Sequence, residues 1–139
     1  QKIVTISYPK AQVSANVYIA ESSAVVGSAG VMTVMDTAVA SVAGKNLVVV
    51  GGSAINAVAA DLLGSAYSEA AFTTATGIGA GEFMIKSFTR SGKTALLVAG
   101  YNAADTEKAV TYLLNNDVDT TVGKNYKGTS ATEASLVVA

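Results

Sequence analysis

The stretch Asn46-Leu-Val-Val-Val-Gly-Gly-Ser-Ala-Ile-Asn-Ala-Val-Ala-Ala-Asp-Leu-Leu-Gly64 decides the fold of this chain. Its continuous apolar run at 47–50 is typical of a strand that is covered on both faces. Two glycines then permit a tight turn, and the Ser53 hydroxyl can cap a helix by accepting from its first free amides. Residues 54–63 predict that helix, and Gly64 can end it in a left-handed conformation. Its apolar side chains recur at helical spacing, namely Ile55, Val58, Ala59, Leu62 and Leu63.

A second unit of the same order surrounds Gly100. Residues 95–99 are another continuous apolar run, and Asn102 can cap a helix over 103–115, with Asp105 in the third position after the cap. Two strand–turn–helix units in succession imply helices packed on a mixed sheet. A chain of 139 residues is long enough for one domain, so we predict a single α/β domain over 1–139.

The remaining elements follow from alternation and from turn residues. Residues 82–89 alternate, and the turn at 91–93 joins them to the run at 95–99. We also expect strands at 31–35, 118–122 and 133–138, and connections at 36–44, at 67–76 and between the last two strands.

The N-terminal segments 2–8 and 12–20 are also strand-like. Apolar and polar residues alternate in the second, and Pro9 between the two marks a break or a sheet edge. The segments form either a hairpin or one extended arm over 1–20 that adds a strand to a neighbouring subunit. The residues expected to make assembly contacts are Ile3, Val4, Ile6, Tyr8, Val13, Val17 and Ile19.

The turn formed by Gly51, Gly52 and Ser53 resembles a phosphate-binding turn, because amides at a helix N-terminus attract anions. A dinucleotide fingerprint requires a third glycine, which the sequence after Gly52 lacks. We therefore interpret these residues as a structural corner and predict no cofactor.

Catalytic candidates are few. The chain contains no histidine and no cysteine, and no base accompanies its serines and threonines. Asp117 and Asp119 share one face of an extended segment and, with threonine oxygens nearby, are calcium candidates. A solvated strand face explains the same pair with fewer ligands than calcium needs. We predict that the protein is not an enzyme.

The composition favours a subunit over a free monomer. Charged residues make up 14% of the chain and hydrophobic residues 50%, whereas soluble domains are usually ~25% charged. A surface with so little charge suits a protein that covers itself with its own copies. Basic residues are not clustered, which argues against nucleic acid, and no apolar stretch reaches the ~20 residues of a membrane span.

Residues 45–63 resemble the archaeal surface-layer (S-layer) protein domain family, in which a Lys-Asn-Leu-apolar-apolar-Val-Gly-Gly turn precedes a helix containing asparagine. The similarity extends in order over about 45–136, through segments 76–81, 95–106, 118–121 and 126–130. The Ala-Gly-Tyr-Asn-Ala-Ala-Asp-Thr block at 99–106 is its most specific part. The Val-Gly-Gly turn is more distantly similar to bacterial cell-wall-binding repeats.

The resemblance implies a non-enzymatic, extracellular structural protein that self-assembles on an archaeal cell, with a signal peptide removed before Gln1. Its partners would be further copies and other cell-surface proteins. Family members are usually longer, so the chain is either a fragment or a small relative. A lattice is implied, and a filament that passes residues 2–20 to the next subunit is also compatible. The alternative function is binding of a cell-wall polymer or a small anion at Gly51, Gly52 and Ser53.

Overall fold

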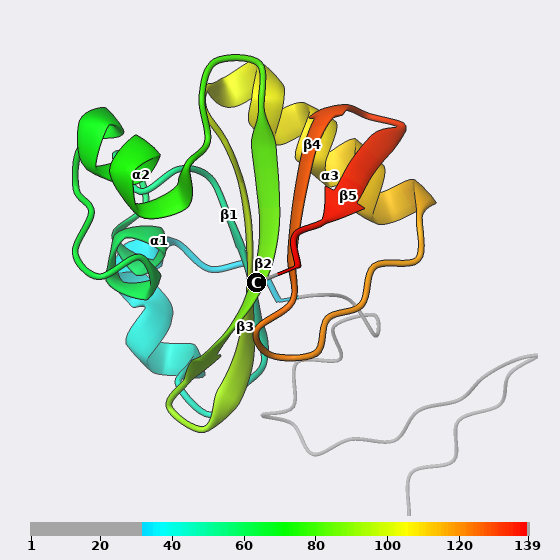
Figure 1. Ribbon diagram of the computed structural model, residues 1–139. Coiled ribbons are helices and arrows are strands. Elements are labelled where there is room, and N and C mark those ends of the chain that lie inside the picture. Colours follow the sequence, from blue (N-terminus) through cyan, green and yellow to red (C-terminus); the bar gives the residue numbers. More distant parts are fainter. Residues whose placement is uncertain (1–31, 139) are drawn as a thin grey trace, which may run out of the picture. The chain divides into compact units, whose positions relative to one another are not determined.

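The structure is a computed structural model that describes residues 32–138, and its residues from Val34 onward form one compact unit (Figure 1). The strands or arm expected within 1–20 lie outside the described residues. The five described strands are β1 (Leu47–Val50), β2 (Phe83–Arg90), β3 (Lys93–Gly100), β4 (Asn125–Ser130) and β5 (Glu133–Leu136).

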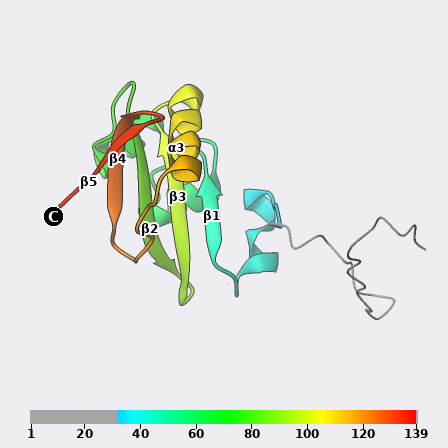
Figure 2. The same ribbon diagram turned by 90° about the vertical axis from the view of Figure 1, so that its right-hand side faces the viewer.

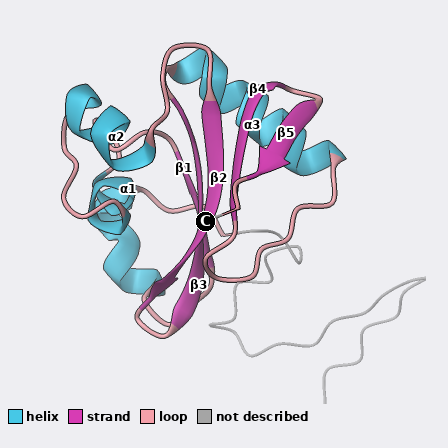
Figure 3. Cartoon of the chain, in the orientation of Figure 1, coloured by secondary structure: helices cyan, strands magenta, loops and turns pink. Residues whose placement is uncertain are grey.

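These strands form one mixed sheet in the order β1-β3-β2-β4-β5 (Figure 3). β1 runs parallel to β3, and the other neighbouring pairs are antiparallel. Helices pack on both faces, which confirms the predicted α/β class with a mixed sheet. One face carries η1 (Asp36–Val42), α1 (Ala57–Leu62) and α2 (Glu69–Thr76), and the other carries α3 (Ala103–Asn115) (Figures 1 and 2).

Strand β3 lies at the centre of two hydrophobic cores. Its Leu97 and Ala99 face α1 and α2, and its Leu96 and Val98 face α3. All four side chains are buried, so the predicted coverage of this strand on both faces is confirmed. The sheet therefore has its most apolar strand where both helical layers press on it.

The same prediction for β1 is wrong. Val49 is buried against the α1 core, but Val48 is 59% exposed and Val50 is 49% exposed. The reason is the position of β1 at one end of the sheet, because α3 packs over β3, β2 and β4. The face of β1 on the α3 side is therefore left uncovered by the described residues.

The predicted helix 103–115 is confirmed with the same bounds. Its cap is also confirmed, since the Asp105 N–H donates to Asn102 Oδ1 at 2.9 Å. The Asp105 carboxylate makes two other contacts, accepting from the Gly81 N–H at 3.1 Å and from Lys108 Nζ at 2.8 Å. Its buried carboxylate thereby fixes the loop before β2 to the start of α3.

The predicted first helix begins three residues later than expected. Asn56, not Ser53, is the cap, and its Oδ1 accepts from the amides of Val58 at 2.9 Å and Ala59 at 3.1 Å. The Gly52 carbonyl first accepts from the amides of Ile55 and Asn56, so one extra turn precedes the helix. Ile55 is consequently 85% exposed and does not belong to the buried stripe. Gly64, with φ +72°, follows the end of the helix as predicted.

Three other sequence expectations are wrong. Residues 32–35 form no strand, and the connection after them contains η1. The expected loop at 67–76 contains α2, capped by Ser68 and ended by left-handed Gly77. Alternating small and polar residues there obscure the apolar stripe, of which Phe72 is the buried anchor.

The closing strands are shifted from their expected places. Residues 118–122, expected to be a strand, are a loop. Strand β4 lies in the segment between the last two predicted strands, which was expected to be a connection. β4 has a polar sequence but pairs on both sides, with β2 and with β5. A Cβ at Gly128 would collide with the Phe83 ring, so glycine is needed where these strands meet the core. The predicted final strand is confirmed as β5, although it ends at Leu136.

Candidate functional site

The turn at Gly51 and Gly52 lies at the carboxyl ends of the parallel strands β1 and β3. The Gly51 N–H donates to the Val98 carbonyl at 3.0 Å, which continues the ladder by one residue. Gly51 has φ +114°, a conformation that L-residues rarely adopt. Glycine at position 51 therefore allows the chain to turn sharply away from the sheet.

Ser53 ends this turn, and its side chain is buried. The residue is only 3% exposed, and its Oγ has no hydrogen-bond partner among residues 32–138. Leaving a buried hydroxyl unpaired lowers the stability of the fold by about 1–3 kcal/mol. The Ser53 Oγ atom is available for one further hydrogen bond. A small hollow lies beside it, lined by Gly52, Ser53, Ala54, Glu69, Phe72, Gly100 and Tyr101.

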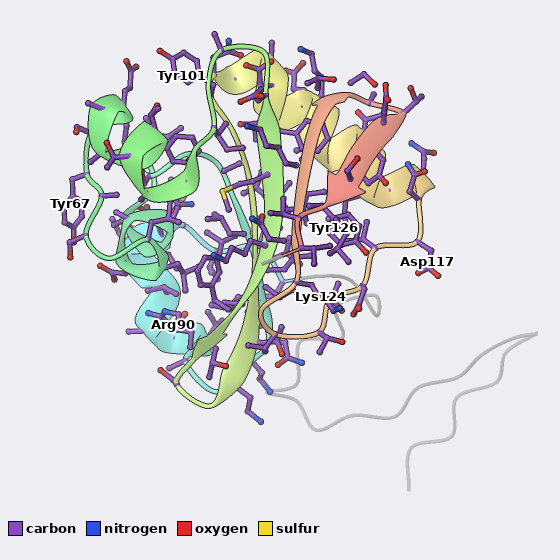
Figure 4. All side chains as sticks on the ribbon, in the orientation of Figure 1. Tyr67, Arg90, Tyr101, Asp117, Lys124 and Tyr126 are labelled. Carbon is purple, nitrogen blue, oxygen red and sulfur yellow. The ribbon has the colours of Figure 1, made fainter. Side chains whose placement is uncertain are left out.

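The two calcium candidates lie in the loop between α3 and β4. Asp117 is exposed and points outward from this loop (Figure 4). Asp119 accepts from the Thr121 N–H at 2.9 Å and lies 3.7 Å from Lys124 Nζ. The Thr121 side chain, and then its backbone N–H, hold the pKa of Asp119 below its usual value. The described residues contain no group of three or more carboxylate, histidine or cysteine side chains arranged for a metal.

An exposed apolar patch surrounds the outer end of the sheet. Two hydrogen bonds assemble it: Asp36 Oδ2 accepts from the Ala57 N–H at 2.9 Å, and Asn56 Nδ2 donates to the Val50 carbonyl at 3.2 Å. They hold the start of η1 and the start of α1 against β1. We call the exposed apolar side chains of these joined segments the β1 patch: Met35 (73% exposed), Val48 (59%), Val50 (49%) and Ile55 (85%).

Sequence reasoning missed the β1 patch. Ile55 and the valines were assigned to buried faces, because apolar periodicity shows which residues share a face but not whether another element covers it. The order of strands, which places β1 at one end, depends on contacts far apart in the sequence. Large apolar groups gathered on a surface mark an interaction site more often than scattered ones.

The assembly residues expected at Ile3, Val4, Ile6, Tyr8, Val13, Val17 and Ile19 lie outside the described residues. Of the two described candidates, the patch is apolar and open, and the hollow beside Ser53 is small.

The family comparison adds a structural role to these two candidate surfaces. Residues 3–117 match the model of the S-layer like family, outer domain. The chain belongs to this family. Neither a curated protein nor a solved structure matches it.

Membership of the S-layer like family gives this outer-domain chain a structural role at the cell surface, outside the cell. The match begins at residue 3, well before the region whose motifs resemble the family, so it includes the expected arm. None of the helices in residues 32–138 has the length and apolarity that crossing a membrane requires.

Proposed function

We propose that this chain is a subunit of a surface layer or filament on an archaeal cell, joined to its copies by strand pairing and apolar contacts. The observation that carries the proposal is the β1 patch, four exposed apolar side chains around a strand at the end of the sheet. Family membership supplies the surface location and the structural role.

Within the described residues, the end strand lacks the charged side chains and proline that often protect an edge against pairing. Natural edge strands are kept apart by charged side chains, proline or bulges. Residues 46–56 contain no charged side chain and no proline, and β1 itself consists of one leucine and three valines. An apolar, unprotected edge is a liability in a monomer and an advantage in a subunit that assembles.

The two ends of the sheet differ, and this difference favours an open assembly. β1 has a parallel neighbour and an apolar sequence, whereas β5 has an antiparallel neighbour and the sequence Glu-Ala-Ser-Leu. A contact between unlike surfaces repeats from copy to copy and continues unless its rotation closes a ring. A sheet or filament requires such a contact.

The N-terminal arm over 1–20 is the proposed donor of the added strand. Its residues 12–20 alternate apolar and polar side chains without an intervening proline. Strand addition derives affinity from main-chain hydrogen bonds and specificity from alternate side chains. Both sources are independent of charge, which is scarce in this chain.

Truncation of the arm tests this function. Chains lacking residues 1–11 or 1–20 should both remain folded by circular dichroism. The 1–20 deletion removes the whole arm, so its polymers should disappear from negative-stain micrographs. Leu114→Lys is the matched surface control, since Leu114 is 78% exposed on α3, and it should assemble normally. Normal assembly of the 1–20 deletion would show that strand exchange through the arm is wrong.

Binding of a cell-wall polymer or a small anion at Gly51, Gly52 and Ser53 is a weaker second candidate. The unpaired Ser53 hydroxyl beside the hollow favours a polar ligand there. Glu69 lines the same hollow, and its carboxylate would repel an anion. A neutral group of a polymer is the more compatible ligand.

A further inference from the structure

We propose that β1 is the acceptor strand of the assembly and that it pairs with residues 12–20 of a neighbouring copy. The inference rests on the proposed function and adds to it the edge that receives the arm. Three features support it: the direction of the β1 backbone groups, the position of η1, and the length of chain between the arm and the described unit.

The free backbone groups of β1 can be assigned from its pairing with β3. The register pairs Val48 with Leu96 and Val50 with Val98, and the Gly51 N–H donates to the Val98 carbonyl. In a parallel pair, alternate residues of a strand direct both backbone groups to the same neighbour. Residues 47, 49 and 51 therefore face β3, and the backbone groups of Val48 and Val50 point away from it.

One of these outward groups is already used. The Val50 carbonyl accepts from Asn56 Nδ2 at 3.2 Å, so pairing on this side is blocked beyond Val50. No backbone group among residues 32–138 pairs with the Val48 N–H, the Val48 carbonyl or the Val50 N–H, which leaves these three to an added strand. They form a short acceptor segment that ends at the turn.

The helix η1 lies next to the outer edge of β1, on one side of the sheet. In Figure 2, η1 lies beyond β1 along the strand order, and Figure 1 shows it on the same side of the sheet as α1 and α2. A strand added to β1 would have η1 over one face and solvent over the other. A strand with one apolar and one polar face suits this position, and residues 12–20 alternate in that way.

The chain between the arm and the described unit is long enough to reach a neighbour. Residues 21–33 can span about 45 Å when fully extended. A domain of this size has a radius of gyration of only about 13 Å. The arm can therefore pass beyond its own unit, and only an arm given to another copy produces the open assembly of the proposed function.

Cross-linking provides the direct test, because the chain has no cysteine of its own. Three sets of single-cysteine chains are needed: Asn16→Cys or Val17→Cys in the arm, Val48→Cys on β1 and Ser135→Cys on β5. Two arm positions are used because they lie on opposite faces of a strand. Each arm chain is mixed with each edge chain, and the two edge chains with each other, under assembly conditions, and the mixtures are treated with a short bis-maleimide.

Each chain carries one cysteine, so any product that joins an arm chain to an edge chain links two copies. We expect an arm–β1 dimer at least tenfold more abundant than an arm–β5 dimer. A predominant arm–β5 or β1–β5 product would overturn the assignment of β1. A chain that carries both Asn16→Cys and Val48→Cys provides a second check. If it cross-links only within itself under the same conditions, the arm does not pair with β1 of a neighbouring copy and the inference is overturned.

A loss-of-function variant separates this inference from the proposed function. Val48→Lys combined with Val50→Lys should reduce the polymer yield at least tenfold, because lysines on an edge strand oppose the addition of another strand. The fold should be kept, since both side chains are exposed. Ser135→Lys on β5 is the matched control and should assemble. If the double variant assembles normally while the 1–20 deletion does not, the arm is the donor but β1 is not its acceptor. If both assemble normally, neither the arm nor β1 joins the copies, and if the natural chain forms no polymer, the proposed function itself is wrong.

Discussion

Of the three glycines at the turn, Gly51, Gly52 and Gly100, the last has the tightest surroundings. It ends β3, and its N–H donates to Thr106 Oγ1 at 3.0 Å. A Cβ at this position would collide with the backbone of Asp105 and Thr106 in the first turn of α3. The close approach lets Asn102 and Thr106 fasten the helix directly to the end of the strand.

Gly100→Ala should therefore destabilise the protein by about 1–3 kcal/mol, because backbone atoms must shift to admit the methyl group. Urea unfolding followed by circular dichroism measures the change. Gly44→Ala is the matched control, since no atom lies within 4 Å of its added Cβ, and its unfolding free energy should be unchanged or slightly raised. Equal stability of the two variants would contradict the close packing at Gly100.

Single residues also show where the local sequence is sufficient to predict a helix cap. The Asn102 cap was predictable because its hydrogen bond to Asp105 depends only on residues three apart. Ser53 was misassigned because two cap residues, Ser53 and Asn56, stand three positions apart before the same apolar stripe. Asn56 prevails because its amide also reaches the Val50 carbonyl, a contact made across the turn.

Among the elements, β1 and β3 show the limit of periodicity most clearly. Both are short apolar runs followed by glycine, and both predict a strand covered on two faces. Only β3 has that environment, because strand order and the width of the α3 layer are set by tertiary packing. Four of the five described strands and two of the helices were thus predictable from the sequence, but β4 and the exposed face that forms the candidate site were not.

A charged clamp joins β4 to the loop between α2 and β2. Lys127 Nζ donates to Glu82 Oε2 at 2.8 Å and to the Gly77 carbonyl at 3.0 Å. Glu82 Oε2 also accepts from the Gly79 N–H at 2.8 Å. The hydrogen bond from Lys127 and then that from Gly79 lower the pKa of Glu82 from its usual 4.5.

The clamp should give stability a defined dependence on pH. The folded-state pKa of Glu82 lies below the unfolded value of 4.5, so its contribution is present above pH 4.5 and is lost as pH falls through the folded pKa. Glu82→Gln should lower the unfolding free energy by about 0.2–1 kcal/mol at pH 7, with the difference from the natural chain shrinking in acid. Urea unfolding from neutral to acid pH measures it.

Glu133→Gln is the comparison for that series, because Glu133 is an exposed carboxyl on β5. Its difference from the natural chain should stay small at each pH. A difference for Glu82→Gln that grew as the pH fell would contradict the assigned direction of the pKa shift.

For the molecule as a whole, the scarcity of charge determines how assembly should respond to salt. The chain has nine basic and ten acidic side chains and a net charge of −1, and the β1 patch contains none of them. Ion pairs between exposed groups are screened at high ionic strength, whereas apolar burial is unaffected or strengthened by excluded salts such as sulfate. The proposed contact belongs to the second kind.

Polymer yield should therefore be unchanged or higher in about 1 M sodium sulfate than in low salt, where the Debye length is several-fold longer. Sedimentation of polymers across a salt series measures this, with sodium chloride as a second salt. The 1–20 deletion is the control for salt-driven aggregation, because it lacks the donor strand and should stay in the supernatant throughout. Polymers that dissolve as salt rises would show that charged side chains hold the copies together, since neither main-chain pairing nor apolar burial weakens under those conditions.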